Sequence, residues 1–318
     1  MIAGDDILDL PTQAVAESLR VHAPTSVIFL CGGEVGDTGL PPKSLRDALV
    51  RISHRSVLAK YDVRCAEEME WALPVGEYLE LLEFEADIAQ ISDLIILFSE
   101  SEGSIAELGA FSVIDEIARR MLVFVDHKNY ADTSFISLGP LGFLTRKHGD
   151  EYVSVLQLQD LGIEDIKKPG DIDLDAFLKA TDGPIKFRLS EKVEPTTFDG
   201  TRNGHITKLI TGLVQYYAAL TLDEIETLLF CMGIPKTPQE IKKHLNCAEL
   251  FEWVQKEKRG ITTYYAAIEG GNALYFELRP EYRSIDRVRW RSDVLNYWRH
   301  NDAERFASIQ VALRKAKS

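Results

Sequence analysis

The stretch Asp93-Leu-Ile-Ile-Leu-Phe-Ser-Glu-Ser-Glu-Gly-Ser-Ile-Ala-Glu-Leu-Gly-Ala-Phe111 joins a short apolar run to the start of a helix. Residues 94–98 form the continuous apolar segment that is typical of a strand buried on both faces. Serines and a glycine follow at once, and helical spacing of apolar residues begins near Ser104. A strand, a turn and a helix in this order are the repeating unit of an α/β domain with a parallel sheet.

The same alternation extends over the first half of the chain. Candidate strands rich in Val, Ile, Leu and Phe occupy residues 27–31, 62–65, 94–98, 121–125 and 152–156, and helical patterns occupy residues 45–52, 76–90 and 104–120. Ser44 and Asp47 have the spacing of a capping box at the start of the first of these helices. We therefore predict a doubly wound, mostly parallel sheet within residues 1–165.

The second half has a different pattern. Residues 166–204 are rich in charges and broken by Pro and Gly, which predicts a connector, with a short helix allowed at residues 174–180. Helical periodicity then covers residues 205–220, 222–232 and 238–245, where Thr237 is an N-cap and Pro238 the first helical residue, and a fourth helix follows Asn246. Residues 261–268 and 272–278, joined by Glu269-Gly270-Gly271, predict a hairpin. Residues 205–318 therefore predict a mainly helical, winged-helix-like domain with a basic C-terminal tail.

Composition indicates a globular, cytoplasmic protein. The chain has 318 residues, 45% of them hydrophobic and 27% charged, and its longest apolar runs are too short for a membrane span or a secretory signal. Cys31, Cys65, Cys231 and Cys247 lie in apolar segments without Cys-x-x-Cys spacing, so we expect buried thiols and no metal site. The net charge of −14 is uneven, because residues 65–118 hold fourteen acids and no Lys or Arg, whereas residues 279–318 hold ten Lys or Arg against five acids. A basic end of this kind suits a polyanion, an acidic partner or a solvated helix.

Ligands of doubly wound sheets bind beyond the carboxyl ends of the strands, so the residues that follow each strand are candidates. The predicted substrate-binding residues at these junctions are Gly32, Gly33, Ser99, Ser101, Gly103, Ser104 and Asp126. Glycines let the backbone approach a ligand, and hydroxyls and amides at a helix N-terminus suit phosphate or sugar groups. Arg46, near the start of the helix after Gly32 and Gly33, is the predicted phosphate contact, although a solvated surface arginine is the alternative.

Glu107 is the candidate working carboxylate. We expect it in the first turn of the helix that begins near Ser104, where the helix dipole favours an ionised carboxylate by about 0.3–1 kcal/mol. A carboxylate held in this form can attack an anomeric carbon or stabilise the cation formed as a base leaves. The spacing of Ser104 and Glu107 also fits a capping box, in which the carboxylate only bonds back to the Ser104 amide. Local sequence leaves both roles open.

The run from Asp93 to Phe111 resembles the motif of nucleoside deoxyribosyltransferase-like proteins, in which a strand opened by Asp leads to a Gly-Ser turn and Glu-Leu-Gly. Together with Cys31-Gly32-Gly33 and Leu82-Glu-Phe-Glu-Ala-Asp-Ile-Ala89, it is similar to glycosidase effectors encoded beside retron reverse transcriptases. The resemblance covers about residues 25–130 by motif and the rest by architecture. It implies a flavodoxin- or Rossmann-like catalytic domain with Glu107 as the nucleophile and Glu85 near the cleft. The chain has Glu102 where relatives often have Pro.

The resemblance also implies a function. It is that of a toxic antiphage N-glycosidase that cleaves the base–ribose bond of NAD or a related nucleotide, with the nucleotide as substrate and no cofactor. The retron reverse transcriptase and its multicopy single-stranded DNA (msDNA) are the implied partners and hold the enzyme inactive, and a higher-order assembly is also implied. One alternative is a (deoxy)ribosyltransferase that modifies a nucleotide, protein or DNA acceptor. Another alternative is a non-catalytic regulator that senses a nucleotide and binds nucleic acid.

The second half offers local basic patches for nucleic acid, because residues 205–280 as a whole hold eight Lys or Arg and nine acids. The predicted nucleic-acid-binding residues are Lys242, Lys243, Lys256, Lys258, Arg259, Arg283, Arg287, Arg289 and Arg291. Around Trp290 the arginines could contact phosphates while the indole stacks on bases. Equally, this segment could be an amphipathic helix that packs Trp290 inward.

Overall fold

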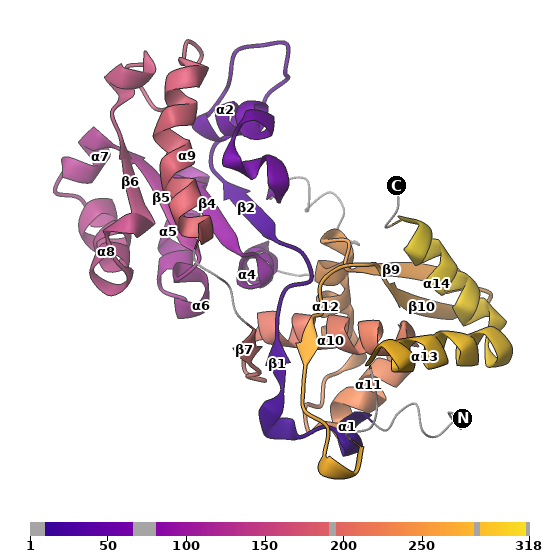
Figure 1. Cartoon of the computed structure of the whole chain (residues 1–318). Helices are drawn as coiled ribbons and strands as arrows, with labels where there is room; N and C mark the ends of the chain where they lie inside the picture. The colour runs from indigo at the N-terminus through magenta and orange to yellow at the C-terminus, as the bar shows by residue number, and fades with distance from the viewer. Residues whose placement is uncertain (1–9, 66–80, 191–194, 283–286, 316–318) are drawn as a thin grey trace. The chain divides into compact units, whose positions relative to one another are not determined.

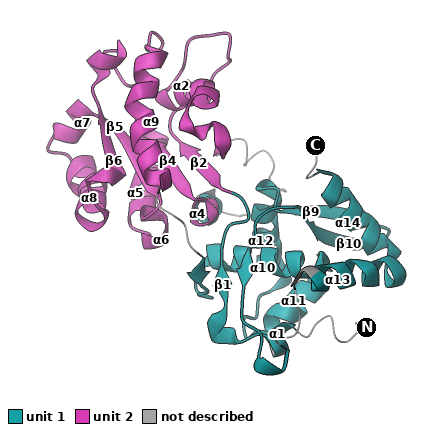
Figure 2. Cartoon of the chain, viewed as in Figure 1, with its two compact units in different colours: residues 1–25, 72–87, 194–318 teal, residues 26–71, 88–193 magenta. Residues whose placement is uncertain are grey.

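The computed structural model describes residues 10–65, 81–190, 195–282 and 287–315, and the chain divides into two compact units (Figure 2). Unit 2 comprises residues 26–71 and 88–193, and unit 1 comprises residues 1–25, 72–87 and 194–318. The predicted boundaries at 165/166 and 204/205 differ from this division. Unit 1 takes residues from three parts of the chain, and the predicted connector contains a long helix of unit 2.

Unit 2 is built on a five-stranded parallel sheet (Figure 1). Its strands are β2 (Val27–Cys31), β3 (Asp62–Cys65), β4 (Leu94–Phe98), β5 (Met121–Asp126) and β6 (Val153–Leu156), in the order β3-β2-β4-β5-β6. All five predicted strands and their parallel direction are confirmed. The strand order reverses direction between β2 and β4, and ligands of doubly wound sheets bind at this switch point.

Helices complete unit 2. The α-helices are α2 (Leu45–Ile52), α5 (Glu102–Ser112), α6 (Asp115–Ala118), α7 (His127–Ala131), α8 (Gly142–His148) and α9 (Leu174–Ser190), and α4 (Leu81–Ile91) contains the boundary between the two units. One face of the sheet packs in a single core with α2 and α9, to which alternate strand residues such as Ile28, Leu30 and Ile96 contribute. Phe98 stacks on Phe124 with ring centroids 5.0 Å apart. The side chain of Phe177 on α9 enters the same core, so α9 is part of the α/β unit.

Unit 1 combines helices with two small antiparallel sheets. Its elements are α1 (Leu10–Gln13), β1 (Arg20–Val21), β7 (Thr196–Thr197), α10 (Asn203–Tyr217), β8 (Ala219–Thr221), α11 (Leu222–Cys231), α12 (Pro238–Leu250), β9 (Val254–Arg259), β10 (Thr262–Ala267), β11 (Leu274–Tyr275), α13 (Arg287–Asn301) and α14 (Ala303–Lys315). One sheet has the order β8-β10-β9 and the other β11-β1-β7. The Thr237 side chain accepts from the Glu240 amide and Pro238 begins α12, as predicted.

Two predictions for the second half are wrong. The hairpin consists of β9 and β10 around Gly260, whose φ of 57° suits a turn, and β11 pairs instead with β1. The helix expected after Asn246 is the continuation of α12. The Gly-Gly turn was a misleading signal, and the charged residues of β9 do not resemble a buried strand.

The structure also bears on the expected burial of the cysteines and on the expected absence of a membrane span. All four cysteines are thiols, and Cys31, Cys65 and Cys247 are buried as expected, but Cys231 is exposed at the end of α11. Within the described residues, no helix is both long and apolar enough to cross a membrane.

Candidate functional site

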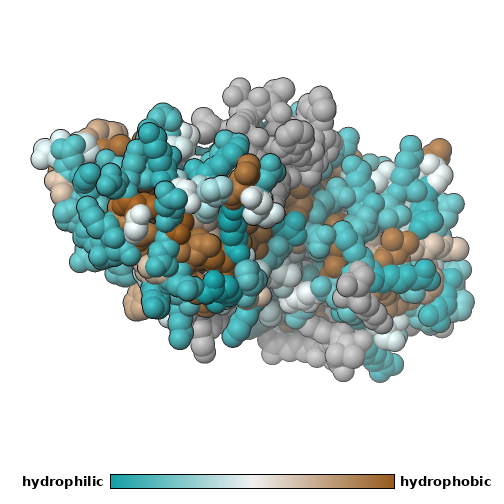
Figure 3. Space-filling model, turned by 90° about the horizontal axis from the view of Figure 1, so that it is seen from above, coloured by the Kyte–Doolittle hydropathy of each residue, from teal (hydrophilic) through white to brown (hydrophobic). Residues whose placement is uncertain are grey.

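The carboxyl edge of the unit 2 sheet carries the site residues that were predicted at the strand–helix junctions. Large hydrophobic side chains are exposed in the segments that follow β2 and β5, namely Val35, Leu40, Tyr130, Phe135 and Leu138. In the left half of Figure 3, which is unit 2 seen from above, hydrophobic residues are visible within a mostly hydrophilic surface. The segments that leave this edge therefore offer both apolar and polar contacts.

Glu100 organises the junction between β2 and α2. The residue follows β4, is 5% exposed, and accepts hydrogen bonds from the amides of Gly33 (2.8 Å), Leu45 (2.6 Å) and Arg46 (3.1 Å). Burial raises the pKa of Glu100 above its ordinary value, although these three amides and the Arg46 charge lower it. The carboxylate therefore occupies the N-terminus of α2, where a doubly wound fold can bind an anion.

Two glycines let this carboxylate approach the backbone. A Cβ at Gly32 would lie 2.7 Å from the Arg46 Cβ and 2.8 Å from a Glu100 carboxylate oxygen, and one at Gly33 would lie 2.7 Å from the Ser44 Cβ. All three distances are too short for an added Cβ. In the structure the group that lies against Gly32 and Gly33 is the protein's own Glu100, and the approach of a ligand to these two glycines stays a prediction.

Arg46 is 2% exposed and lies inside this junction. Its Nε donates to the Gly33 carbonyl at 2.6 Å. This hydrogen bond and its burial give Arg46 a structural role in holding the loop after β2. Contact of Arg46 with a substrate phosphate stays a prediction.

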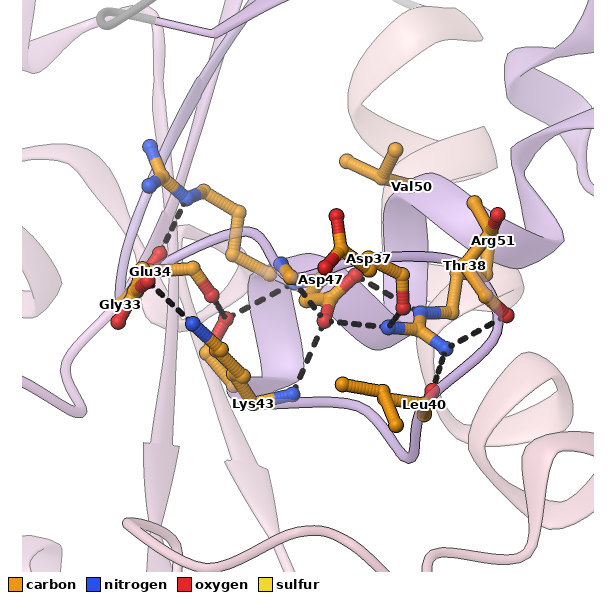
Figure 4. Close-up of polar contacts among 12 residues, drawn as sticks. Gly33, Glu34, Asp37, Thr38, Leu40, Lys43, Asp47, Val50 and Arg51 are labelled. Carbon is orange, nitrogen blue, oxygen red and sulfur yellow. Dashed lines mark hydrogen bonds and ion pairs between the residues drawn. The ribbon is translucent and has the colours of Figure 1, made fainter.

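The loop of residues 33–43 is anchored by Asp47 on α2 (Figure 4). Its carboxylate accepts from the amides of Gly36 (3.1 Å) and Lys43 (2.9 Å) and from Arg51 (2.8 Å), whose guanidinium also donates to the Asp37 carbonyl at 2.9 Å. Burial would raise the pKa of Asp47, but the hydrogen bonds from Arg51 and the two amides outweigh it and lower that pKa. Half of the predicted capping box is present, because the Ser44 side chain accepts from the Asp47 amide while the Asp47 carboxylate holds the loop.

The junction between β4 and α5 is capped by neutral hydroxyls. The Ser101 side chain accepts from the Ser104 amide at 3.1 Å, and the Ser104 hydroxyl accepts from the Ser101 amide at 3.0 Å. Helix α5 therefore begins at Glu102, and its capping box is formed by Ser101 and Ser104, so the alternative of a capping box of Ser104 with Glu107 is wrong. Gly103 is exposed, whereas Ser99 and Ser104 are buried.

Glu107 is the sixth residue of α5 and is half-buried. It lies in the second turn, not the first as expected, so the stabilisation of its charge by the helix dipole is weaker there. The acid of the first turn is Glu102, which is exposed and pairs with Lys167 at 2.7 Å. Glu107 is thus separated from the helix terminus, and the capping interpretation no longer accounts for it.

Asp126 caps a third helix at this edge. It ends β5, is 4% exposed, and its carboxylate accepts from the Asn129 amide (3.0 Å) and from the Asn129 side chain (2.5 Å) at the start of α7. Among the helices α2, α5 and α7, two N-termini therefore receive a carboxylate of the protein itself, and α5 has a neutral cap.

Glu85 lies on the part of α4 that belongs to unit 1 and is 6% exposed. Its position near the cleft stays a prediction. Its neighbour Asp87, also in unit 1, accepts from the Asn203 side chain at 2.8 Å.

Glu100 is the residue of this site that sequence reasoning missed. It lies between Ser99 and Ser101, which are both predicted substrate-binding residues, so its position just after β4 could have indicated a role at the same junction. Its partners, Leu45 and Arg46, are more than fifty residues away in the chain, and no local pattern predicts such contacts.

The predicted nucleic-acid-binding residues fall into two groups. Lys242 on α12 and Lys256 and Lys258 on β9 are exposed, whereas Lys243 pairs with Glu83 at 2.8 Å and Arg259 with Glu257 at 3.6 Å. In the second group, Arg283 and the side chain of Arg287 lie outside the described residues, and Arg289 and Arg291 are exposed on α13.

Trp290 packs within unit 1. Its indole donates to the Tyr216 carbonyl at 3.1 Å, and its ring stacks on Tyr216 with centroids 4.9 Å apart. The interpretation of α13 as an amphipathic helix that packs Trp290 inward therefore fits the structure, and stacking of this indole on bases does not.

Comparison with known proteins places the chain in a family. The model of the STM3845 retron effector protein matches residues 42–256, which is more than half of the chain. An Escherichia coli relative named "Retron Ec73 putative ribosyltransferase/DNA-binding protein" is 26% identical over 85% of this chain and 84% of its own length. A second Escherichia coli relative, named "Retron Ec86 putative ribosyltransferase/DNA-binding protein", is 35% identical over 37% of each chain. The chain belongs to the STM3845 family of retron effectors.

Proposed function

We propose that this retron effector breaks the base–ribose bond of NAD or a related nucleotide, with Glu107 as the carboxylate at the anomeric carbon. The names of both relatives include a ribosyltransferase, which acts on such a bond. Either water or another acceptor then takes the ribosyl group. Hydrolysis makes the enzyme an N-glycosidase, and transfer makes it a ribosyltransferase.

The observation that carries the proposal is the difference between helix N-termini at one sheet edge. Glu100 fills the N-terminus of α2 and Asp126 that of α7, while α5 is capped by the hydroxyls of Ser101 and Ser104. The serine cap is neutral, and the first-turn acid, Glu102, is exposed and pairs with Lys167 at 2.7 Å. The N-terminus of α5 therefore contains no buried carboxylate of the kind that fills α2 and α7, which favours its use by a polar or anionic ligand. Glu107 lies on the same helix, one turn further along.

The proposed reaction needs one carboxylate and no cofactor. The Glu107 carboxylate bonds to the anomeric carbon as the carbon–nitrogen bond breaks, and the base leaves with the bonding electron pair. With NAD the leaving nicotinamide is neutral, because that electron pair cancels the pyridinium charge. Attack by water then breaks the ester, restores Glu107 and releases one proton.

The test is release of free base from NAD and from a panel of nucleotides by the purified protein. Glu107→Gln keeps the size of the side chain but removes the charged nucleophile, so we expect a rate loss of at least about 100-fold. Glu102→Gln is the matched control, because Glu102 is a carboxylate on the same helix and is exposed. Equal rates for wild type and Glu107→Gln would refute the assignment of Glu107.

A second proposed activity is nucleic-acid binding by unit 1. Helix α10, strand β8, helices α11 and α12, and the hairpin of β9 and β10 follow one another in the order of a winged helix, and the names of both relatives include DNA binding. Lys242, Lys256 and Lys258 are exposed on this part of the chain. Replacing these three lysines by Glu is expected to weaken DNA binding and lower its salt dependence by about one counterion per lost contact. If the triple variant binds DNA with the same affinity as wild type, these three lysines are not part of a DNA-binding surface.

Membership of a retron effector family supports a third proposal, on control by the retron. We propose that the reverse transcriptase and msDNA hold the effector inactive. Addition of the purified reverse transcriptase–msDNA complex should then suppress base release by the wild-type protein. Unchanged release at saturating complex would refute this form of control.

A further inference from the structure

The anion-binding position at the start of α2 is already filled. The amides of Gly33, Leu45 and Arg46 donate to the Glu100 carboxylate at 2.6–3.1 Å, which is the arrangement that such an N-terminus offers to a ligand phosphate. Leu45 and Arg46 are the first two residues of α2, where backbone amides have no partner within the helix. Only 5% of the surface of Glu100 is exposed to solvent, so the residue is almost completely buried.

The surrounding residues fit a carboxylate that stays in place. Gly32 and Gly33 leave no space for a Cβ beside Glu100, and the Arg46 guanidinium is held by the Gly33 carbonyl in the same junction. The Glu100 amide is also fixed, because it donates to the Ser104 hydroxyl at 3.2 Å. The side chain is therefore restrained from both strand–helix junctions.

We infer that Glu100 is an internal anion that takes the position of a ligand phosphate at the β2–α2 junction and so closes this helix N-terminus to the phosphate of a nucleotide. That the ligand is a nucleotide rests on the proposed function. The occupation of the anion position does not, because it depends only on the contacts of Glu100. Glu100 is in this sense a specificity-determining residue, because it excludes a phosphate from the start of α2.

The experiment asks whether a small anion can replace the carboxylate. Glu100→Ala removes the carboxylate and leaves three amides around a space, so formate, acetate or inorganic phosphate should bind there and stabilise the variant. We expect these anions to raise the melting temperature of Glu100→Ala by about 3 °C or more beyond the effect of sodium chloride at the same ionic strength. Wild type and Glu102→Ala, whose carboxylate is exposed, should lack this additional increase.

The outcomes separate this inference from the proposed reaction. The same anion response in all three proteins would overturn the inference, whatever the role of Glu107, because melting does not depend on catalysis. If Glu100→Ala does not fold in chloride, recovery of folded protein when it is refolded in acetate or phosphate supports the inference. Failure to refold in every anion tested, while Glu102→Ala refolds normally, overturns it.

Discussion

The β2–α2 and β4–α5 junctions differ in how they satisfy a helix N-terminus. At the first, a buried carboxylate from a distant part of the chain bonds to Gly33, Leu45 and Arg46, and at the second, Ser101 and Ser104 cap the helix reciprocally. The first junction is closed by charge, packing and restricted space. The second has a neutral serine cap, and Glu102 and Gly103 beside it are exposed. One sheet edge therefore combines a helix N-terminus filled by a buried carboxylate with one that has exposed residues and no buried charge.

The largest expected effect is on the closed junction. Glu100→Ala leaves three amides and the neighbouring Arg46 charge without their carboxylate, so we expect a loss of about 3–5 kcal/mol in the free energy of unfolding. Urea denaturation of wild type and variant measures it, in buffers without carboxylate or phosphate. A loss below about 1 kcal/mol would mean that water replaces the carboxylate and that the junction is not closed.

The glycines of the two junctions should respond in opposite directions. Gly33→Ala puts a Cβ 2.7 Å from the Ser44 Cβ, whereas the nearest atom to a Cβ at Gly103 is 3.9 Å away. We expect Gly33→Ala to destabilise by about 1–3 kcal/mol, and Gly103→Ala to stabilise by about 0.5–1 kcal/mol because alanine is the better helix residue. Denaturation midpoints of the two variants decide this, and a similar change in both would contradict the contrast in space.

A third prediction uses the opposite pKa shifts of the two carboxylates that hold the loop after β2. The lowered pKa of Asp47 means that its stabilisation is present above its ordinary value of 3.8 and is lost as the pH falls through the lowered value. Asp47→Asn should therefore cost about 1–2 kcal/mol at pH 7, and the difference from wild type should vanish in acid.

Glu100 should show the reverse slope. Its raised pKa means that stability falls as the pH rises from the ordinary value of 4.5 through the raised value, and Glu100→Gln should remove this fall. Unfolding free energies measured across this pH range for the two variants test both signs. A parallel slope in Asp47→Asn and Glu100→Gln would contradict the distinction between the two carboxylates.

Much of unit 2 could be predicted from sequence because its signals are local. The central strands β2, β4 and β5 contain short apolar runs, and the N-cap of α2 is a single Ser three residues before the amide from which it accepts. The N-cap of α12 in unit 1 is a Thr at the same spacing. The start of α5 was misplaced by two residues, because Ser101 and Ser104 are both capping residues and either could begin the helix. With the helix start at Glu102, Glu107 is a residue of the second turn and is no longer a possible cap.

The rest depended on contacts that no local pattern contains. Glu100 contacts Leu45 and Arg46 across the sheet edge, although a glutamate resembles a surface group in sequence. Inward packing of Trp290 was one of two open alternatives, but its partner, Tyr216, could not be predicted from the pattern of its helix. Likewise, β11 pairs with β1, more than 250 residues away, so a Gly-Gly turn near it was a misleading hairpin signal. Tertiary partners decided these elements, and propensity alone could not.

The smallest expected change in stability is the sharpest test of the comparison. Asp and Ser are nearly equal N-caps, so Ser101→Asp should alter the free energy of unfolding by less than about 0.5 kcal/mol. It would nevertheless give α5 a carboxylate at its N-terminus, as α2 and α7 have. Together with Glu102 in the first turn, this negative charge would disfavour an anionic ligand. Base release should therefore fall for NAD at unchanged stability, whereas Ser101→Thr, which keeps a neutral cap, should retain activity. If Ser101→Asp cleaves NAD as wild type does, the neutral cap is not what admits the ligand, and the difference between the two junctions is one of folding alone.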